Sequence, residues 1–153
     1  MTAAVLFATA AAPCLAAPPA FVAPAGWRAN PPDQNAPATA SPVMLWHVPG
    51  DTTTSLTFLH TSQSYDDSLG AIHTNLATNK IKPAVDKDLP CQGKTAHVVE
   101  FTGGPDAHKI VMNRLLVPMP DGVAAITYSH EDGSKPDPDV VKAESDYCAA
   151  SGT

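Results

Sequence analysis

The chain has little positive charge, few aromatic residues and no long apolar run beyond its N-terminal region. Only 9 of its 153 residues are Lys or Arg, against 15 Asp or Glu, so the formal net charge is −6. Binding of nucleic acid through its phosphates needs clustered positive charge, and this composition therefore argues against that class of protein. A membrane-spanning helix needs about 18 apolar residues in a row, and no such run follows the N-terminal region.

Several motifs of catalytic and metal-binding proteins are also missing. The sequence contains no G-x-S-x-G, no glycine-rich loop ahead of a predicted helix, and no pair of cysteines at C-x-x-C spacing. Those motifs would indicate a hydrolase nucleophile, a phosphate-binding loop and a structural zinc site, respectively. Catalytic triads are defined by geometry rather than by residue order, so an enzyme without a sequence motif is still open.

The N-terminal segment has the pattern of an export signal. Residues 3–12 (AAVLFATAAA) are apolar, Pro13 ends the run, and small residues follow. An apolar core of this length is typical of a signal peptide and is too short to span a membrane. We expect residues 1–16 to be the signal peptide, with cleavage before Ala17, and the mature chain to be periplasmic or extracellular. The basic region that usually precedes the apolar core is absent, because the first Lys or Arg is Arg28. The alternative is that this segment is a buried Ala-rich helix.

The cysteines fit export. Cys14 would be removed with the signal peptide, which leaves Cys91 and Cys148. Two distant cysteines in an exported chain favour a disulfide over a metal site, and we predict a Cys91–Cys148 bridge. Two alternatives are a lipoprotein acylated at Cys14 and a pair of buried free thiols.

Proline is abundant, and much of it lies near the N-terminus. The chain has 16 prolines, about twice the usual share. Residues 17–42 are rich in proline and alanine and are interpreted as a linker. Within it, residues 21–27 (FVAPAGW) place two aromatic residues around a Pro-Ala-Gly turn. We expect this segment to dock on the folded domain, with Trp27 as its anchor.

Residues 43–150 have the pattern of a single domain with both strands and helices. Strand-like runs at 43–48 and 55–60, joined by a polar turn, predict a hairpin. Residues 81–93 are interpreted as a connection. Three further strand-like runs with short turns between them predict an antiparallel meander, at 95–102, 109–117 and 122–129.

Two helices are predicted in this domain. Apolar residues at helical spacing predict a helix over 65–78, with Ser64 as its N-cap; they are Tyr65, Leu69, Ile72 and Leu76. The second helix begins after Asp137, with Pro138 at its first position. The element order is therefore ββ-α-βββ-α, an α+β fold in which two helices pack on an antiparallel sheet.

This order resembles that of PsbP-like domains. The resemblance covers residues 21–150 and includes an aromatic-Pro-Gly-Trp entry, a meander that ends in PDGVAAITY, and a C-terminal helix. It implies helices flanking a central antiparallel sheet, and an exported, non-catalytic binding or accessory role. It does not imply a photosynthetic role, and the Cys91–Cys148 pair departs from the family pattern.

Histidines are the residues most suggestive of a catalytic or metal site. Four of the six lie at or near the ends of predicted strands, namely His47, His60, His97 and His130. Strand ends of one sheet can converge, although a metal-bound imidazole normally also has a carboxylate or carbonyl behind it. The alternative is that these are half-solvated side chains. His73 lies beside the apolar stripe of the first helix and is expected to be a boundary residue.

Four residues are candidate ligand contacts. Glu144 falls in the middle of the expected buried face of the second helix, where desolvation would raise its pKa; the other members of that face are Val140, Val141, Tyr147 and Cys148. Glu144 either touches a ligand or lies at the helix edge with its carboxylate reaching water or a Lys. Arg114 interrupts an apolar strand, and either contacts a ligand or marks the solvent side of the meander. Trp46 and His47, in the first strand of the hairpin, complete the set.

The sequence thus favours an exported, non-enzymatic binding or accessory module, whose partner is a protein, a lipid or an envelope component. We assign it no cofactor, no catalytic residue and no metal ligand. The alternative is a small secreted hydrolase or metal-dependent enzyme that uses convergent histidines. The position of the histidines in space discriminates between the two hypotheses.

Overall fold

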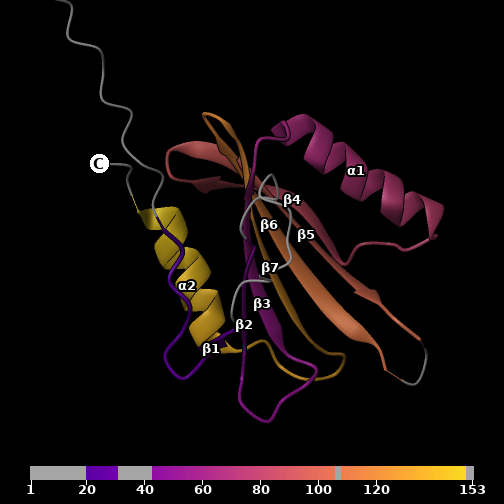
Figure 1. Cartoon of the computed structure of the whole chain (residues 1–153). Helices are drawn as coiled ribbons and strands as arrows, with labels where there is room; N and C mark the ends of the chain where they lie inside the picture. The colour runs from indigo at the N-terminus through magenta and orange to yellow at the C-terminus, as the bar shows by residue number, and fades with distance from the viewer. Residues whose placement is uncertain (1–19, 31–42, 106–107, 151–153) are drawn as a thin grey trace, which may run out of the picture.

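The computed structural model describes residues 20–30, 43–105 and 108–150 (Figure 1). In these ranges the chain forms a seven-stranded antiparallel sheet and two helices, which confirms the predicted α+β class. Neither helix is long and apolar enough to cross a membrane. The elements in chain order are β1 (Arg28–Ala29), β2 (Val43–His47), β3 (Ser55–Thr61), α1 (Tyr65–Thr78), β4 (Val85–Cys91), β5 (Lys94–Gly103), β6 (Ile110–Met119), β7 (Gly122–Glu131) and α2 (Pro138–Ala149).

The strands are arranged in the order β1-β2-β3-β7-β6-β5-β4. The predicted hairpin is β2–β3, and the predicted meander is β5–β6–β7, both antiparallel as expected. The two units are joined by the pairing of β3 with β7, in which Phe58 lies opposite Ile126. This long-range pairing places the start of the domain beside its last strand, and so makes one continuous sheet.

The β6–β7 turn lies close to the end of β3. Gly122 has a φ of 149°, and a Cβ atom built on it would lie 1.9 Å from the carbonyl oxygen of Thr61. Only glycine fits here, because any side chain would collide with the backbone of the neighbouring strand.

The sequence interpretation of residues 81–93 as a connection is wrong, because Val85–Cys91 forms β4 and pairs along its length with β5. β4 is an edge strand, and its residues are mostly exposed on both faces. The sequence of β4 therefore has only a weak alternation of apolar and polar residues, and Pro90 argues against a strand. An edge strand tolerates both proline and charge, because one side of its backbone makes no ladder hydrogen bonds.

Side chains on opposite faces of the sheet form two separate hydrophobic clusters. Consecutive residues of a strand point to opposite faces. On β6, Leu115 and Val117 accordingly pack with α2, whereas Leu116 packs with α1. Figure 1 shows the two helices on the two sides of the sheet. Two helices packed on an antiparallel sheet are the architecture that the sequence predicts.

Helix α1 has the predicted limits. The hydroxyl oxygen of Ser64 accepts a hydrogen bond from the backbone N–H of Asp67, at 3.1 Å, and so caps the N-terminus. Ile72 and Leu76 are buried against the sheet, and Tyr65 and Leu69 pack partly buried beside them. The spacing of these four residues follows the helical period, which explains why the pattern was readable from the sequence.

Helix α2 begins as predicted, with Asp137 accepting a hydrogen bond from the N–H of Asp139 at 2.9 Å. Val140 and Tyr147 are buried, but Val141 is 52% exposed. The expectation that Val141 packs on the sheet is therefore wrong. Two residues seven positions apart define the buried stripe of this short helix, and Val141 lies about 100° around the helix from Val140.

The cysteine pair predicted from the sequence, Cys91 and Cys148, forms a disulfide, with Cα atoms 4.2 Å apart. It joins the end of β4 to the last turn of α2. Next to it, the backbone N–H of Gln92 donates to the carbonyl of Cys148 at 2.7 Å, and its side-chain amide donates to the carbonyl of Tyr147 at 3.0 Å. The C-terminal end of α2 is thus fixed to the sheet edge by a covalent bond and two hydrogen bonds.

The segment before β1 lies against the α2 side of the sheet. Phe21 is 7% exposed and packs among Trp46, Phe58 and Tyr147, at ring-centroid distances of 5.8–5.9 Å. Trp27 is half-buried and packs edge-to-face with Tyr128, with ring centroids 6.3 Å apart. Phe21 is therefore more deeply buried than Trp27, the expected anchor. The expected signal peptide and residues 31–42 of the expected linker lie outside the described residues.

Candidate functional site

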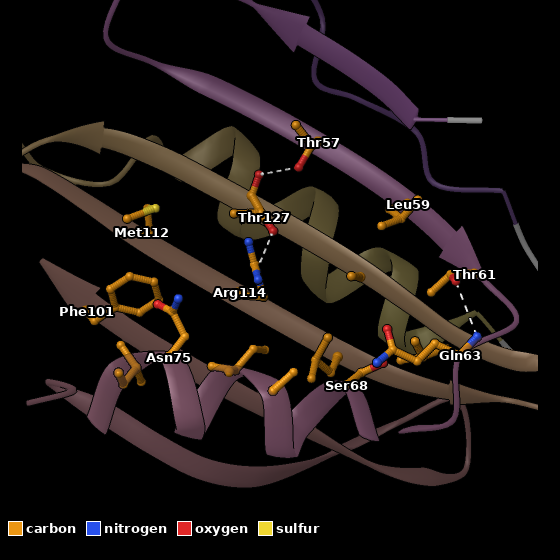
Figure 2. A pocket seen from close by; sticks show the side chains of 16 residues that line it. Thr57, Leu59, Thr61, Gln63, Ser68, Asn75, Phe101, Met112, Arg114 and Thr127 are labelled. Carbon is orange, nitrogen blue, oxygen red and sulfur yellow. Dashed lines mark hydrogen bonds between the residues drawn. The ribbon is translucent and has the colours of Figure 1, made fainter. Parts of the chain in front are cut away.

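Helix α1 covers only part of its side of the sheet, and a groove of about 560 Å³ runs between α1 and β3 (Figure 2). α1 packs on β5, β6 and β7 through Ile72 and Leu76. On the same face, β3 extends beyond the reach of the helix. The groove lining is mainly apolar, and its apolar members include Leu59, Phe101, Met112 and Val123.

Strand alternation places one charged residue in the groove lining. Leu115 and Val117 turn toward α2, so Arg114 and Leu116 of β6 turn toward α1. Arg114 is the only titratable side chain among the residues that line the groove. The sequence pattern identified Arg114 as unusual within an apolar strand, but it could not say which helix would leave it uncovered.

Arg114 is held in place by one hydrogen bond. Its Nε donates to Oγ1 of Thr127, the residue opposite it on β7, at 3.0 Å. No carboxylate of the described residues forms an ion pair with its guanidinium. Burial lowers the pKa of Arg114 from its usual value, but a guanidinium stays protonated near neutral pH. The groove therefore contains a partly desolvated positive charge.

A second polar group in the groove is unpaired. The hydroxyl oxygen of Ser68, on α1, is buried and has no hydrogen-bond partner among the described residues. Figure 2 shows Ser68 and Asn75 reaching from α1, across the groove from the strand carrying Arg114. Buried polar atoms normally have partners, so Ser68 offers a hydrogen bond to a bound molecule or to water.

The four residues predicted as ligand contacts do not form one site. Arg114 lies in the groove on the α1 face. Trp46 is 9% exposed and belongs to the core on the α2 face, where it packs against Phe21. His47 ends β2, and its Nδ1 is buried without a partner among the described residues. Glu144 lies on α2, on the opposite side of the sheet from Arg114.

Glu144 is a half-buried acid. One carboxylate oxygen, Oε1, is inaccessible and has no hydrogen-bond partner among the described residues. Desolvation raises the pKa of Glu144 from 4.5 to about 7. Lys142, the Lys of the same helix, pairs with Asp146 rather than with Glu144.

The four histidines at strand ends are kept apart. By strand alternation, His60 and His130 lie on the α2 face and His97 on the α1 face of the sheet. His60 contacts Asp121 at 3.0 Å, whereas His130 stacks on Tyr128. The described residues include one group whose ligand atoms could share a metal ion, and it contains only one of these four histidines.

That group consists of His73, Asp86 and His97, whose ligand atoms all lie within 4.8 Å of one another. His73 is exposed, as expected of a boundary residue, but its contact with Asp86 was not foreseen. The sequence interpretation placed residues 81–93 in a connection and so gave Asp86 no partner. Recognition of β4 as a strand paired with β5 would have put Asp86 and His97 on one face.

Comparisons with known proteins give little further information. Neither the protein-family models nor the curated protein sequences give a match to this chain. Among solved structures, the chain is similar to LpqN, which is described as involved in cell envelope biogenesis of Mycobacterium tuberculosis. The TM-score is 0.37 at 13% identity, over 87% of this chain and 79% of that one. At this level of likeness, the fold assignment depends on the strand order and registers described above.

Proposed function

We propose that the protein is an exported, non-enzymatic binding module, and that the groove beside α1 holds an amphiphile with one anionic headgroup. The observation that carries the proposal is Arg114, a half-buried cation with no acidic partner among the described residues, in a groove with mainly apolar walls. An anionic headgroup would supply the missing charge, and an alkyl chain would cover the apolar walls.

The size and chemistry of the groove support such a ligand. Small-molecule sites usually have volumes of about 300–1,000 Å³, with mostly apolar walls and a few polar groups that fix orientation. This groove has about 560 Å³, with Arg114 as its one charged side chain and Ser68 as an unpaired hydroxyl in its wall. Hydrogen bonds between a guanidinium and a carboxylate or phosphate are roughly twice as strong as neutral ones. The lining thus favours retention of an anion.

Calorimetric titration with dodecanoate tests this proposal. We expect one dodecanoate per chain, with dodecanol, which has the same chain and a neutral head, binding about 10-fold more weakly. Acetate, which offers the headgroup alone, should bind much more weakly than dodecanoate, because it leaves the apolar walls uncovered. Equal affinity for dodecanoate and dodecanol would contradict the role of Arg114.

Two matched variants locate the site. Arg114→Gln should lower the affinity for dodecanoate about 10-fold and leave dodecanol binding nearly unchanged. Arg28→Gln removes the same charge from the exposed strand β1 and should leave both affinities unchanged. Equal losses in the two variants would mean that net charge, rather than the groove, attracts the ligand.

Export is part of the same proposal. We infer that residues 1–16 are a signal peptide, that residues 17–42 include a linker, and that residues 43–150 are the domain, located in the periplasm or outside the cell. The disulfide supports this location, since such bonds persist in oxidising compartments.

The arrangement of helices on both faces of an antiparallel sheet supports a relation to PsbP-like domains. Mass spectrometry of the exported protein should find Ala17 at its N-terminus, and a retained Met1 would overturn the proposal.

A further inference from the structure

A cluster of two imidazoles and two carboxylates lies under the flank of α1 that faces away from the groove. His73 comes from α1, Asp86 and Asp88 from the edge strand β4, and His97 from β5. Oδ1 of Asp86 lies 3.2 Å from Nε2 of His73 and 2.6 Å from Nε2 of His97. Nδ1 of His97 lies 2.6 Å from Oδ1 of Asp88.

The sheet register brings these residues together. Asp88 lies directly opposite His97, and Asp86 lies opposite Val99, two residues further along β5. Residues two apart on a strand share a face, so both carboxylates and His97 point to the α1 side. The helix then places His73 above them. Three consecutive elements thus bring His73 and His97 to one oxygen atom, Oδ1 of Asp86.

The arrangement of His97 is compatible with that of a metal ligand and its supporting carboxylate. A metal-bound histidine usually coordinates through one ring nitrogen and donates the N–H of the other to a carboxylate or carbonyl. Here Nε2 faces the shared centre, and Nδ1 faces Asp88. A neutral imidazole has only one N–H and cannot donate to both carboxylates. A cation at the centre would satisfy Nε2 and Asp86 together and leave the N–H on Nδ1 for Asp88.

We propose that His73, Asp86 and His97 bind a divalent zinc-type cation through Nε2, Oδ1 and Nε2, and that Asp88 is a positioning residue acting through His97. Tetrahedral zinc with bonds of about 2.0–2.1 Å holds its ligand atoms about 3.3 Å apart. The three atoms now lie within 4.8 Å of one another, and the contact of 2.6 Å would have to open by about 0.7 Å.

The surroundings allow that adjustment and give access to an ion. The side chains of His73 and Asp86 are 44% and 37% exposed, so both can move and can be reached from solvent. The side chain of His97 is only 11% exposed, which gives the site one fixed ligand. Imidazole and carboxylate ligands together suit Zn²⁺ better than Mg²⁺ or Ca²⁺, which take oxygen ligands.

Calorimetry with Zn²⁺, and absorption spectroscopy with Co²⁺ as a coloured substitute, test the site on the full chain. We expect one Zn²⁺ per chain at micromolar concentration and no heat with Mg²⁺. His73→Gln and Asp86→Asn should each weaken Zn²⁺ binding at least 10-fold. Asp88→Asn should weaken it about 10- to 100-fold, as is typical for a carboxylate behind a ligating histidine. In the wild type, Co²⁺ should give the strong visible bands of a tetrahedral site.

His60→Gln is the matched control, because His60 also contacts an aspartate, Asp121, at 3.0 Å, but at a different place in the sheet. It should bind Zn²⁺ as the wild type does. None of the substituted residues belongs to the two hydrophobic clusters, so circular dichroism should show each variant folded.

Zn²⁺ should raise the melting temperature of the wild type and not that of His73→Gln, since only an ion bound to the native state stabilises it. Unchanged affinity in His73→Gln, or absence of binding in the wild type, would overturn the proposal. Neither result would bear on dodecanoate binding in the groove.

Discussion

Arg114 and Thr127 lie directly opposite each other on β6 and β7, and the Nε of Arg114 donates a hydrogen bond to Oγ1 of Thr127 at 3.0 Å. The bond fixes one edge of the guanidinium against the sheet, and Arg114 lines the groove. A residue that would otherwise be a mobile surface charge is thereby held as a recognition group.

Thr127→Val tests this orientation, because valine keeps the shape of threonine and removes the oxygen. We expect the affinity for dodecanoate to fall about 3- to 10-fold, since Arg114 must then be ordered by the ligand. The unfolding free energy should fall by about 0.5–1.5 kcal/mol. Thr57→Val is the control, because its hydroxyl makes only a weak contact of 3.5 Å to the carbonyl of Thr127. A larger loss of dodecanoate affinity in Thr57→Val than in Thr127→Val would contradict the role assigned to Thr127.

Glu144 should make stability depend on pH. Its pKa is raised to about 7 in the folded state by desolvation, so the folded chain holds a proton that the unfolded chain has lost above its ordinary pKa near 4.5. The unfolding free energy should therefore fall as the pH rises from about 4.5 to 7, by roughly 3 kcal/mol in total, and then level off.

Glu144→Gln removes that titration and should be more stable than the wild type above pH 7, as measured by urea unfolding at several pH values. The difference between the two proteins should shrink toward pH 4.5. Glu131→Gln, at an exposed position at the end of β7, should follow the wild-type curve. Identical pH profiles for Glu144→Gln and the wild type would show that Glu144 is ionised at little cost.

Leu76 should account for much of the stability that α1 provides. It is 3% exposed and packs in the α1-side core with Ile72 and Val99. Leu76→Ala should lower the unfolding free energy by about 2–5 kcal/mol, because it leaves a cavity under the helix. Thr74→Ala, at an exposed position of the same helix, should change it by no more than about 0.5 kcal/mol. Equal effects of the two substitutions would mean that the helix is not held by its apolar stripe.

The disulfide should be a large part of the total stability. Cys91 and Cys148 are 57 residues apart in the sequence, and the chain-entropy model gives a loop of this length about 4 kcal/mol. Replacement of both cysteines by serine should therefore lower the denaturant midpoint strongly. Denatured mature protein should show no free thiol before reduction and two after it. Two thiols without reduction would contradict both the bond and the inferred compartment.

The parts of the fold that could be predicted from the sequence are those in which local residues alone determine the structure. The spacing of Leu69, Ile72 and Leu76, with Ser64 ahead of them, is enough to specify α1, because helix period and capping are properties of a few neighbouring residues. Asp137 and Pro138 specify the start of α2 in the same way. The cysteine pair followed from a count, since removal of the expected signal peptide leaves two cysteines to pair.

The tertiary structure alone decided which strands neighbour one another and what each helix leaves uncovered. β4 was missed because an edge strand is stabilised by its partner β5 rather than by burial of its own side chains. The convergence of His73 with Asp86 and His97 depends on that missed pairing and on the path of α1 over the sheet. Arg114 was recognisable as an exception within an apolar strand, but its role depends on whether a helix covers it. Such contacts join residues of different elements, and a sequence pattern records only the preferences of residues within one element.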